Sequence, residues 1–499
     1  MRKISSAHSE PLHSVAATRE LERLSAAGLP PHTLMQRAGL SVARLALALA
    51  PHARHIWIAC GPGNNGGDGF EAAMHLHRWG KTVTLTWTGL PSGTAKQPPD
   101  AQASREHALA AGVPMAASPP EDFDFCIDAL LGIGGVLDPG RAGTPLMLEW
   151  LERMRASGTP RLAVDMPTGL DADTGTFTAG LAAAPHVFTL SLLTLKPGLF
   201  TANGRDRAGQ VWFDHLGTVS TQSSAPQIWL LGADLAGQAA KQANAHASHK
   251  GSFGDVAVLG GESTAHSHMA GAALLAARAA LHAGAGRVFV ALLGSPVMAV
   301  DPQQPELMFR SPDALDLAQQ VVVCGCGGGD AVRNALPRIL SVAPRLVLDA
   351  DALNAIAADT QLQTQLAARH HRGYATVLTP HPLEAARLAG ASVKEIQADR
   401  LASARLLAER FQCVVVLKGS GTVIAAPGRP SAVNSSGNAL LATAGTGDVL
   451  AGMLGAGMAG GMEAFEAACS TVFAHGRIAD EWAARGSGQP LTASALASA

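Results

Sequence analysis

The chain has 499 residues, of which 47% are hydrophobic and 15% are charged, and its formal net charge is -2. This balance argues against a disordered chain and against a nucleic-acid binder, which usually carries a basic stripe. Six cysteines are too sparse for a disulfide scaffold. The longest apolar run, Val449–Met462, is too short for a membrane span, and no apolar run follows the basic N-terminus as in a signal peptide. We therefore expect a cytoplasmic protein that binds neither nucleic acid nor membrane.

The first half of the chain predicts helices followed by an α/β pattern. Two helices are expected within residues 15–50, separated by the turn Gly28-Leu29-Pro30-Pro31. Short apolar runs then alternate with helical stretches, which is typical of a parallel sheet with right-handed crossovers. The strands predicted here are 55–60, 82–88, 123–130, 161–166, 187–193 and 210–213.

The second half predicts another series of the same kind. A polar stretch without periodicity, residues 217–227, is the best linker in the chain. The strands predicted beyond it are 255–259, 287–293, 321–324, 345–349, 375–378, 414–417 and 422–425. No repeat relates the two halves, so we expect two different three-layer α/β domains in tandem. Their predicted bounds are 1–218 and 244–499, with a linker and entry to the second domain at 219–243.

A glycine-rich segment after the first of these strands carries the first chemical signal. Gly61-x-Gly63-x-x-Gly66 fits the dinucleotide-binding fingerprint, but the acidic residue that usually ends the next strand is missing. An ordinary hydride-transferring enzyme is therefore disfavoured. The loop Asn64–Gly69 presents two amides and a carboxylate at a helix entrance, where they would hold a phosphate, an alkali cation or ribose hydroxyls. Alternatively, Asp68 only caps the helix.

Three later strand ends carry further polar residues. Asp128 ends one strand, Asp165 ends the next and is followed by Thr168, and Lys196 comes after a third. The carboxyl ends of parallel strands meet at one edge of a sheet and form its ligand crevice. We therefore expect these side chains to line one site.

Together the motifs NNGGDG, DALLG, VDMPTGLDADTG and TLKPGL resemble the NAD(P)H-hydrate epimerase family, the YjeF N-terminal domain, over about residues 14–216. The resemblance implies a Rossmann-like fold that inverts C6 of hydrated NADH and NADPH (NADHX and NADPHX), with Asp165 as the proton-handling group. It also implies a potassium ion held by Asn65, Asp128 and Thr168. The substrate-lining residues implied are Asn64, Asn65, Gly66, Gly67, Asp68, Gly132, Ile133, Gly134, Gly135, Val136, Leu137 and Asp138. Ile133 and Gly135 stand where the family usually has Thr and Leu, and Thr168 where Ser is commoner.

In the second half, Gly445-Thr446-Gly447-Asp448 precedes an apolar helix. Glycines at a helix N-terminus turn backbone N–H groups towards an anion, and the helix adds positive potential. An Asp at that spot would repel a phosphate unless it takes the proton from a hydroxyl that attacks the phosphoryl group. The alternative is that Asp448 merely caps the helix. Similar strand ends at 348–354, 379–382 and 418–422 accompany this motif.

The motifs GTGD, LKGSGT, TPHPLE and LDADALN resemble the ribokinase-like superfamily and, within it, the NAD(P)H-hydrate dehydratase family, the YjeF C-terminal domain, over about residues 245–490. The resemblance implies that Asp448 is the catalytic base. The adenine nucleotide would be held by Lys418, Gly419, Ser420, Gly421, Thr422 and Gly447, and the hydrated dinucleotide by Gly254, Gly327, His381 and Asp448. The turn Cys324–Gly329 lacks the family's proline, Leu383 stands in place of a glycine, and so does Ala444.

Both resemblances point to one substrate pair, NADHX and NADPHX. They imply epimerisation by the first domain and dehydration of the S epimer by the second, driven by ADP with magnesium, in a homo-oligomer. The main alternative is a ribokinase-type small-molecule kinase fused to a nucleotide-binding domain, and a third is a non-catalytic scaffold. The abundant glycines, 54 in all, are expected to mark where the backbone approaches phosphate.

Overall fold

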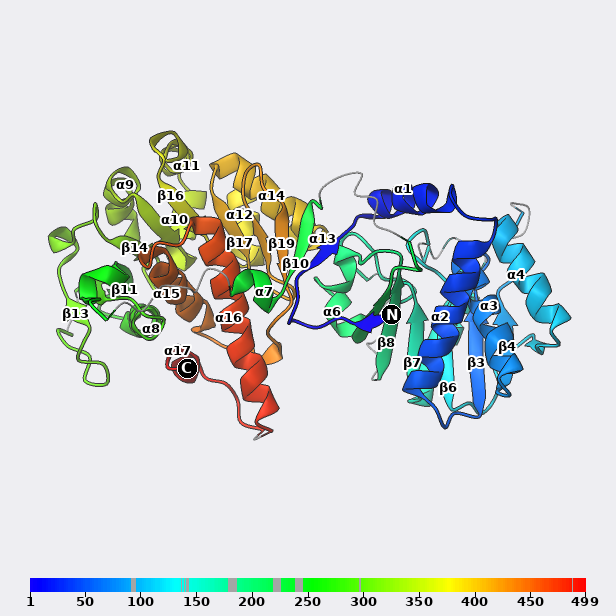
Figure 1. Ribbon diagram of the computed structural model, residues 1–499. Helices are drawn as coiled ribbons and strands as arrows, with labels where there is room; N and C mark the ends of the chain where they lie inside the picture. Colours follow the sequence, from blue (N-terminus) through cyan, green and yellow to red (C-terminus); the bar gives the residue numbers. More distant parts are fainter. Residues whose placement is uncertain are drawn as a thin grey trace. The chain divides into compact units, whose positions relative to one another are not determined.

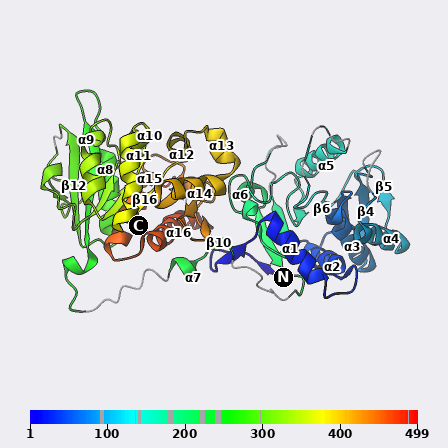
Figure 2. The same ribbon diagram turned by 90° about the horizontal axis from the view of Figure 1, so that it is seen from above.

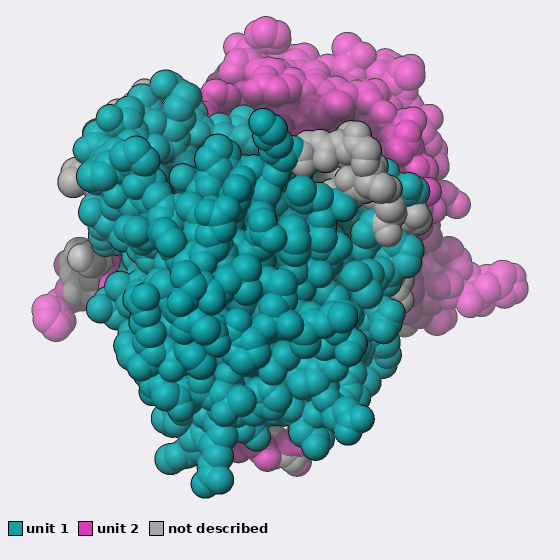
Figure 3. Space-filling view, turned by 90° about the vertical axis from the view of Figure 1, so that its right-hand side faces the viewer, with its two compact units in different colours: residues 1–4, 11–226 teal, residues 5–10, 227–499 magenta. Residues whose placement is uncertain are grey.

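The computed structural model describes residues 1–90, 96–135, 137–138, 140, 143–177, 186–218, 226–237, 246–295, 298–486 and 488–499. The chain forms two compact units, which consist of residues 1–4 with 11–226 and of residues 5–10 with 227–499 (Figure 3). Each unit is a sheet with helices on both faces, so the predicted class of two tandem three-layer α/β domains is confirmed (Figure 1). Among the described helices, none combines the length and the apolar character needed to cross a membrane.

Unit 1 is built on an eight-stranded sheet. All neighbouring strands run parallel except β1, which pairs antiparallel with β9. The strand order is β1 (Arg2–Lys3), β9 (Gln210–Asp214), β8 (Val187–Leu192), β7 (Arg161–Val164), β6 (Phe125–Ala129), β3 (His55–Cys60), β4 (Thr82–Trp87) and β5 (Met115–Ala116). The helices are α1 (Val15–Ala26), α2 (Thr33–Leu49), α3 (Asn64–Arg78), α4 (Pro99–Ala110), α5 (Thr144–Ser157) and α6 (Gly204–Arg207).

Strand β3 shows why this sheet is covered on both faces. Successive side chains of a strand point to opposite faces, and here both sets are apolar. Ile56 and Ile58 pack into the core on the side of α2 and α3, whereas Trp57 and Ala59 pack against α5. Figure 2 shows α5 on the opposite face of the sheet from α2 and α3. The side chains of this continuous apolar run are therefore buried on both faces of the sheet, as in other parallel sheets.

Unit 2 is built on an eleven-stranded sheet. Its strands are parallel from β13 to β17, and β18 is antiparallel to both of its neighbours. The order is β13 (Met308–Phe309), β12 (Arg287–Gly294), β11 (Asp255–Ser263), β14 (Val321–Cys324), β15 (Arg345–Leu348), β16 (Ala375–Leu378), β17 (Val414–Leu417), β18 (Val423–Ala425), β19 (Ser431–Asn434), β10 (Ile228–Leu231) and β2 (Glu10–Leu12).

Eleven α-helices are described in unit 2. Two of them, α8 and α15, pack closely because they are rich in Ala and Gly. A Cβ added at Gly452 would lie 1.9 Å from the carbonyl oxygen of Ala276, so no larger residue fits there. The helices are α7 (Ala233–Ala236), α8 (Ala270–His282), α9 (Val332–Val342), α10 (Ala350–Ala357), α11 (Thr360–Ala368), α12 (Pro382–Ala389), α13 (Val393–Ala398), α14 (Arg400–Phe411), α15 (Thr446–Ala459), α16 (Ala464–Ala484) and α17 (Ala493–Ala497).

The structure differs from the predicted organisation at the ends of the domains. Residues 5–10, predicted in the first domain, belong to unit 2. The segment predicted as linker and entry contains β10 and α7, both elements of unit 2, while 219–225 and 238–243 lie outside the described residues. β10 is held by its pairing with the distant strand β19, and the backbone N–H of Ala233 at the start of α7 donates to the carbonyl oxygen of Ser6. Their own sequences carry little periodic signal.

Candidate active sites

The candidate site of unit 1 lies where four neighbouring strands end. β3, β6, β7 and β8 are adjacent in the sheet, so the loops that follow them meet at one edge. A cavity of about 680 Å³ lies at this edge. The predicted residues that line it are Asn64, Asn65, Asp68, Gly132, Ile133, Gly134, Gly135 and Asp165, together with Lys196.

Four other predicted residues are not part of this lining. Gly66 and Gly67 lie in the first turns of α3, and Leu137 is buried in the core on the α5 side. Asp138 Oδ1 accepts a hydrogen bond from the backbone N–H of Gly140 at 2.9 Å, so this side chain makes a local contact within its own loop. The predicted Val136 lies outside the described residues.

The predicted loop Asn64–Gly69 is in fact the beginning of a helix. α3 starts at Asn64 with Gly63 as its N-cap residue, so Asp68 does not cap it. A Cβ added at Gly66 would lie 2.1 Å from the Gly61 carbonyl oxygen, and one at Gly69 would lie 2.6 Å from the Ala129 Cβ. These glycines allow the helix to pack tightly on the sheet. The prediction that glycines mark phosphate contacts is therefore too broad.

The three predicted potassium ligands surround one turn, residues 130–132. Thr168 Oγ1 donates to Asp128 Oδ1 at 2.6 Å and accepts from the backbone N–H of Leu131 at 3.0 Å. Asn65 Oδ1 would lie 3.0 Å from a Cβ on Gly132, and its buried Nδ2 has no hydrogen-bond partner. Asp128 is fully buried. The backbone N–H groups of Leu130 and Thr168 also donate to the Asp128 carboxylate, and carboxylate, hydroxyl and amide oxygens are ligands that suit a hard cation.

Asp165 forms an ion pair with Lys196 inside the same site. The Lys196 ammonium group donates to Asp165 Oδ1 and to the carbonyl oxygen of Leu192, the latter at 2.8 Å. Only 1% of the Lys196 side chain is exposed, against 13% of Asp165. Asp165 adopts a φ of 63°, a left-handed conformation that costs free energy in a non-glycine residue and is common at functional sites.

Further carboxyl groups make this cavity acidic. Burial, together with the charge of Asp165, raises the pKa of Asp68 well above its usual range. Burial and the charge of Asp165 also raise the pKa of Glu22. Several carboxyl groups are therefore close to one buried cation, Lys196, and the pKa values of Asp68 and Glu22 are raised. Such a site can exchange protons with a bound molecule.

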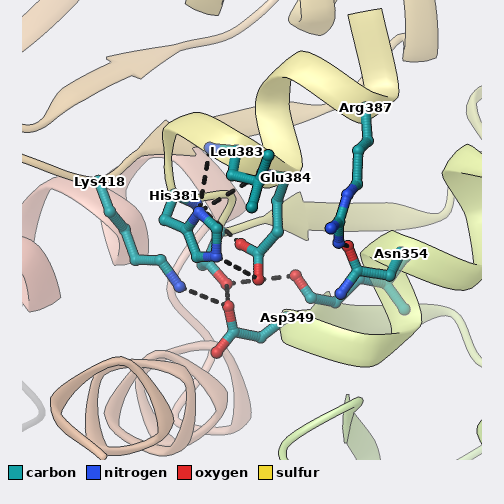
Figure 4. A network of polar contacts seen from close by, with 9 residues as sticks. Asp349, Asn354, His381, Leu383, Glu384, Arg387 and Lys418 are labelled. Atoms are coloured by element: carbon teal, nitrogen blue, oxygen red, sulfur yellow. Dashed lines mark hydrogen bonds and ion pairs between the residues drawn. The ribbon is translucent and has the colours of Figure 1, made fainter. Parts of the chain in front are cut away.

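The candidate site of unit 2 lies at the ends of another four neighbouring strands. Cys326 and Gly327 follow β14, Asp349 follows β15, Thr379 and His381 follow β16, and Lys418 follows β17. The N-terminus of α15, with Asp448 in its first turn, reaches the same edge. Figure 4 shows the side chains from β15, β16, β17 and α12 pointing towards one another.

An ion pair between Asp349 and Lys418 forms the centre of this site. Lys418 Nζ lies 2.7 Å from Asp349 Oδ1, which also accepts from Thr379 Oγ1 at 2.8 Å. Lys418 Nζ would lie 3.2 Å from a Cβ on Gly447, so the lysine borders the N-terminus of α15. Burial lowers the pKa of Lys418, but Asp349 and Glu384 outweigh this effect and the net shift is upward. The lysine therefore stays charged.

Asp448 forms no ion pair with any cation among the residues that the structure describes, because Lys418 pairs with Asp349. Burial, followed by the charge of Asp349, raises the pKa of Asp448 to about 7, although a hydrogen bond from Cys326 opposes the shift. The N-cap residue of α15 is Gly445, so the alternative that Asp448 merely caps the helix is wrong. A carboxylate with a pKa near neutrality is well matched to act as a general base.

His381 has a clear local role in this site. Its Nδ1 accepts hydrogen bonds from the backbone N–H groups of Leu383 and Glu384, at 3.1 and 3.4 Å, and Glu384 Oε2 accepts from the backbone N–H of His381 at 2.8 Å. The two residues thus form a capping box at the start of α12 (Figure 4). Burial raises the pKa of Glu384 to about 7 and lowers the pKa of His381.

Of the two glycines predicted to contact the dinucleotide, Gly327 and Gly254, only the first lies at the site. Gly327 is at the site and adopts a φ of 59°, and its carbonyl oxygen accepts from the backbone N–H of Glu262 at 2.7 Å. Gly254, in contrast, precedes β11 and lies at the amino end of the sheet. A Cβ there would lie 2.2 Å from the carbonyl oxygen of Ala459, at the far end of α15 from Asp448. Close packing explains this glycine, and the structure does not bring it to the site.

The predicted nucleotide segment forms the turn between β17 and β18. Gly419, Ser420, Gly421 and Thr422 make up this turn, and Thr422 Oγ1 donates to the Gly419 carbonyl oxygen at 3.1 Å. The buried Arg400 donates to the carbonyl oxygens of Leu417 and Lys418 at 3.1 and 3.2 Å. Sequence reasoning assigned no role to Arg400, because nothing in a helical stretch marks one arginine as buried.

Lys196 was expected to line the first site because it follows a strand, and the structure places it there. Asp349 was part of a recognised motif at a strand end but was given no individual role, although its position after a strand could have identified it. Glu384 follows His381 at capping-box spacing, which is a usable signal.

Two family models match the chain, one to each half. The model described as YjeF-related protein N-terminus matches residues 31–198, and the model described as NAD(P)H-hydrate dehydratase matches residues 256–498. The bifunctional NAD(P)H-hydrate repair enzyme Nnr of Escherichia coli (strain K12) is 37% identical over 485 residues, which cover 93% of this chain and 88% of that protein. The chain belongs to the family of bifunctional NAD(P)H-hydrate repair enzymes.

Further relatives support this assignment to the NAD(P)H-hydrate repair family. The Nnr protein of Coxiella burnetii is 34% identical over 498 residues and covers 96% of both chains. The ADP-dependent (S)-NAD(P)H-hydrate dehydratase of Neisseria meningitidis serogroup B is 44% identical over 246 residues, 48% of this chain and 80% of that protein. Both predicted resemblances are confirmed. A small-molecule kinase fused to a binding domain would leave the match over residues 31–198 unexplained.

Proposed function

We propose that each unit carries one active site for the repair of hydrated NADH and NADPH. Family membership supports an enzyme that is both an isomerase and a lyase. Unit 1 interconverts the R and S epimers of NAD(P)HX, and unit 2 dehydrates the S epimer with ADP. The observation that carries this proposal is the placement of Asp448. This carboxyl group lies in the first turn of α15, near Lys418, and its pKa is raised to about 7.

In unit 2, Asp448 takes the proton from the C6 hydroxyl of the substrate while that oxygen attacks the terminal phosphoryl group of ADP. AMP leaves, and the hydroxyl has become a phosphate ester, which is a better leaving group. The C6–O bond then breaks, phosphate departs, and the loss of a proton from the neighbouring ring carbon restores NAD(P)H. Backbone N–H groups of Gly445–Gly447 stabilise charge on the moving phosphoryl group.

Lys418 and Asp349 prepare this site for nucleotide phosphates. Lys418 supplies a positive charge next to Gly447, and Gly419–Thr422 form the adjoining turn that we propose for the adenine nucleotide. Magnesium, when bound with the nucleotide, would neutralise part of the phosphate charge. It prefers oxygen ligands, and Asp349 Oδ2 faces Gly447, 3.8 Å from the position of an added Cβ. His381 and Gly327 are proposed contacts of the dinucleotide.

In unit 1, Asp165 is the group that exchanges a proton with the hydrated nicotinamide ring. Lys196 is a positioning residue, because its ammonium group holds the Asp165 carboxylate in place. The cavity of about 680 Å³ accommodates the ring and its ribose. Asn64, Asn65, Asp68 and Gly132–Gly135 line it and are proposed to contact the substrate.

A potassium ion is proposed at Asn65, Asp128 and Thr168. The residues fit such an ion, because Asp128 is buried and its carboxylate, the Thr168 hydroxyl and Asn65 Oδ1 offer the oxygen ligands that an alkali cation prefers. When bound, the ion supplies a positive charge that balances Asp128 and stiffens the turn at residues 130–132. The homo-oligomer and the cytoplasmic location stay predictions.

Incubation with hydrated NADPH, ADP and magnesium tests the function. We expect the absorbance of reduced nicotinamide to recover, and the R epimer to be consumed as well as the S epimer. Chromatography without nucleotide follows epimer exchange alone. No recovery with either ADP or ATP would show that the protein does not dehydrate this substrate.

A further inference from the structure

A cluster of three metal-binding side chains lies in unit 1 apart from the proposed catalytic groups. His32, Glu71 and His107 come from the start of α2, from α3 and from α4, and their ligand atoms all lie within 4.8 Å of one another. His32 Nε2 is 2.9 Å from Glu71 Oε1, and His107 Nδ1 is 3.6 Å from the same oxygen. Two imidazole rings thus direct nitrogen atoms at one carboxylate oxygen.

Burial makes this cluster unusual. Only 1% of the Glu71 side chain and 10% of the His32 side chain are exposed. A carboxylate is rarely buried unless it is paired or binds a metal. The other buried positions of α3 are Asn65 and residues of the types Ala, Gly, Phe, Met and Leu, so Glu71 is the one acidic side chain classed as buried among the described residues of this helix.

The second ring nitrogen of His32 is an independent sign of a ligand. His32 Nδ1 is buried without a hydrogen-bond partner, and the nearest carboxylate oxygen, Asp100 Oδ1, is 3.7 Å away. A histidine that binds a metal through one nitrogen usually directs its other N–H towards a carboxylate. With the metal on Nε2, His32 would carry its proton on Nδ1 and direct it at Asp100.

We propose that His32 Nε2, Glu71 Oε1 and His107 Nδ1 bind one Zn²⁺ ion, with Asp100 orienting His32. Zinc takes imidazole and carboxylate ligands at about 2.0–2.2 Å in a tetrahedron, which sets neighbouring ligand atoms about 3.3 Å apart. The distances from Glu71 Oε1 to His32 Nε2 (2.9 Å) and to His107 Nδ1 (3.6 Å) lie on either side of that value. Three protein ligands leave the fourth position for water.

The site has both an entry path and a structural consequence. Half of the His107 side chain is exposed (53%), and His32 and Asp100 line the cavity that also holds Asp165. A bound ion would join the α1–α2 connection, α3 and α4, which together form one wall of this cavity. His32 already adopts a φ of 70° there, a conformation that a metal bond would help to hold.

Calorimetry with Zn²⁺ on the metal-stripped full chain tests the proposal. We expect one ion per chain, and we expect His107→Gln to abolish this binding, because a half-exposed side chain can be replaced without unfolding the unit. Asp100→Asn should weaken binding about 10–100-fold, as expected for an orienting partner. His52→Gln, an exposed histidine outside the cluster, is the matched control and should bind as the parent does.

Cobalt provides a second measurement that does not depend on activity. Co²⁺ bound in place of zinc should give the intense visible absorption of a tetrahedral site, and Glu71→Gln and His107→Gln should remove it. If zinc binds equally well to His107→Gln, the ion lies elsewhere, for example at Cys326, Asp349 and Asp448, and the proposal is wrong. Absence of stoichiometric binding would mean that Glu71 and His32 form only a buried ion pair.

Discussion

The two sites use a buried lysine in different ways. In unit 1, Lys196 pairs with Asp165, the carboxylate that we propose handles the proton. In unit 2, Lys418 pairs with Asp349, a neighbour of the proposed base, and Asp448 is left without a cation. Both lysines follow a strand of a parallel sheet, so the same position in an α/β architecture serves either to orient a reacting group or to bind an anion.

This difference changes the surroundings of the two acidic groups. Burial and Asp349 raise the pKa of Asp448 to about 7, since its neighbour's charge is only partly compensated by Lys418. Asp165, by contrast, accepts a hydrogen bond directly from the Lys196 ammonium group. These surroundings agree with the roles that we propose, a base that accepts a proton during phosphoryl transfer in unit 2 and a carboxylate held in one place in unit 1.

The largest effect is expected from Asp448→Asn. Loss of a general base costs about 10²–10⁴-fold in rate, so dehydration should fall by this factor while epimer exchange continues. Recovery of reduced-nicotinamide absorbance measures the first activity and chromatography the second. If exchange stops as well, the assignment of two separate active sites is wrong.

Asp165→Asn is the reciprocal variant. Exchange should fall by a similar factor of about 10²–10⁴, while pure S epimer is still dehydrated. A preparation of mixed epimers should then be repaired only up to its S fraction. Complete repair of the mixture by this variant would contradict the role proposed for Asp165.

Lys196→Met should mainly reduce the stability of unit 1. Removing one partner of a buried ion pair leaves an uncompensated charge and costs about 3–5 kcal/mol of unfolding free energy. Denaturant unfolding followed by the fluorescence of the buried Trp57 and Trp150 measures this loss. Arg23→Met, which removes an exposed partner of Glu20, is the control and should change the transition little. Equal effects would contradict the buried pairing.

Thr168→Val tests the proposed potassium site. The change removes a donor to Asp128 and an acceptor for the N–H of Leu131, at a cost of about 1–3 kcal/mol for the groups left unpaired. Exchange should also lose its dependence on potassium. Thr168→Ser keeps the oxygen and should retain both properties, so a loss in that variant too would argue for packing instead.

The smallest expected effect is on pH dependence. Asp448 accepts a proton only when ionised, so dehydration should fall about tenfold per unit below about pH 7 and level off above it. Because the charge of Asp349 helps to raise this pKa, Asp349→Asn should move the midpoint of the rate profile to lower pH. Glu384→Gln should leave the midpoint in place, and a shift there would point to Glu384 as the titrating group.

Much of the fold could be predicted because its signals are local. The apolar runs at 55–60, 321–324, 375–378 and 414–417 became β3, β14, β16 and β17 with the same bounds. Two-residue strands such as β1, β5 and β13 were not predicted, since hydrogen bonds to a neighbouring strand define them. The start of α3 at Asn64 was also misjudged, because four glycines within the seven residues 63–69 suggest a loop until the close contacts with the sheet are known.

The sequence by itself determined the alternation of strands and helices, the motif at each strand end and therefore the family. The tertiary structure alone decided which charges meet. Nothing in the spacing of residues 32, 71 and 107 connects them, and nothing in the motifs pairs Lys418 with Asp349 rather than with Asp448. Backbone patterns follow from short-range sterics and hydrophobic periodicity, whereas ionisation and ion binding depend on burial and on neighbours distant in the chain.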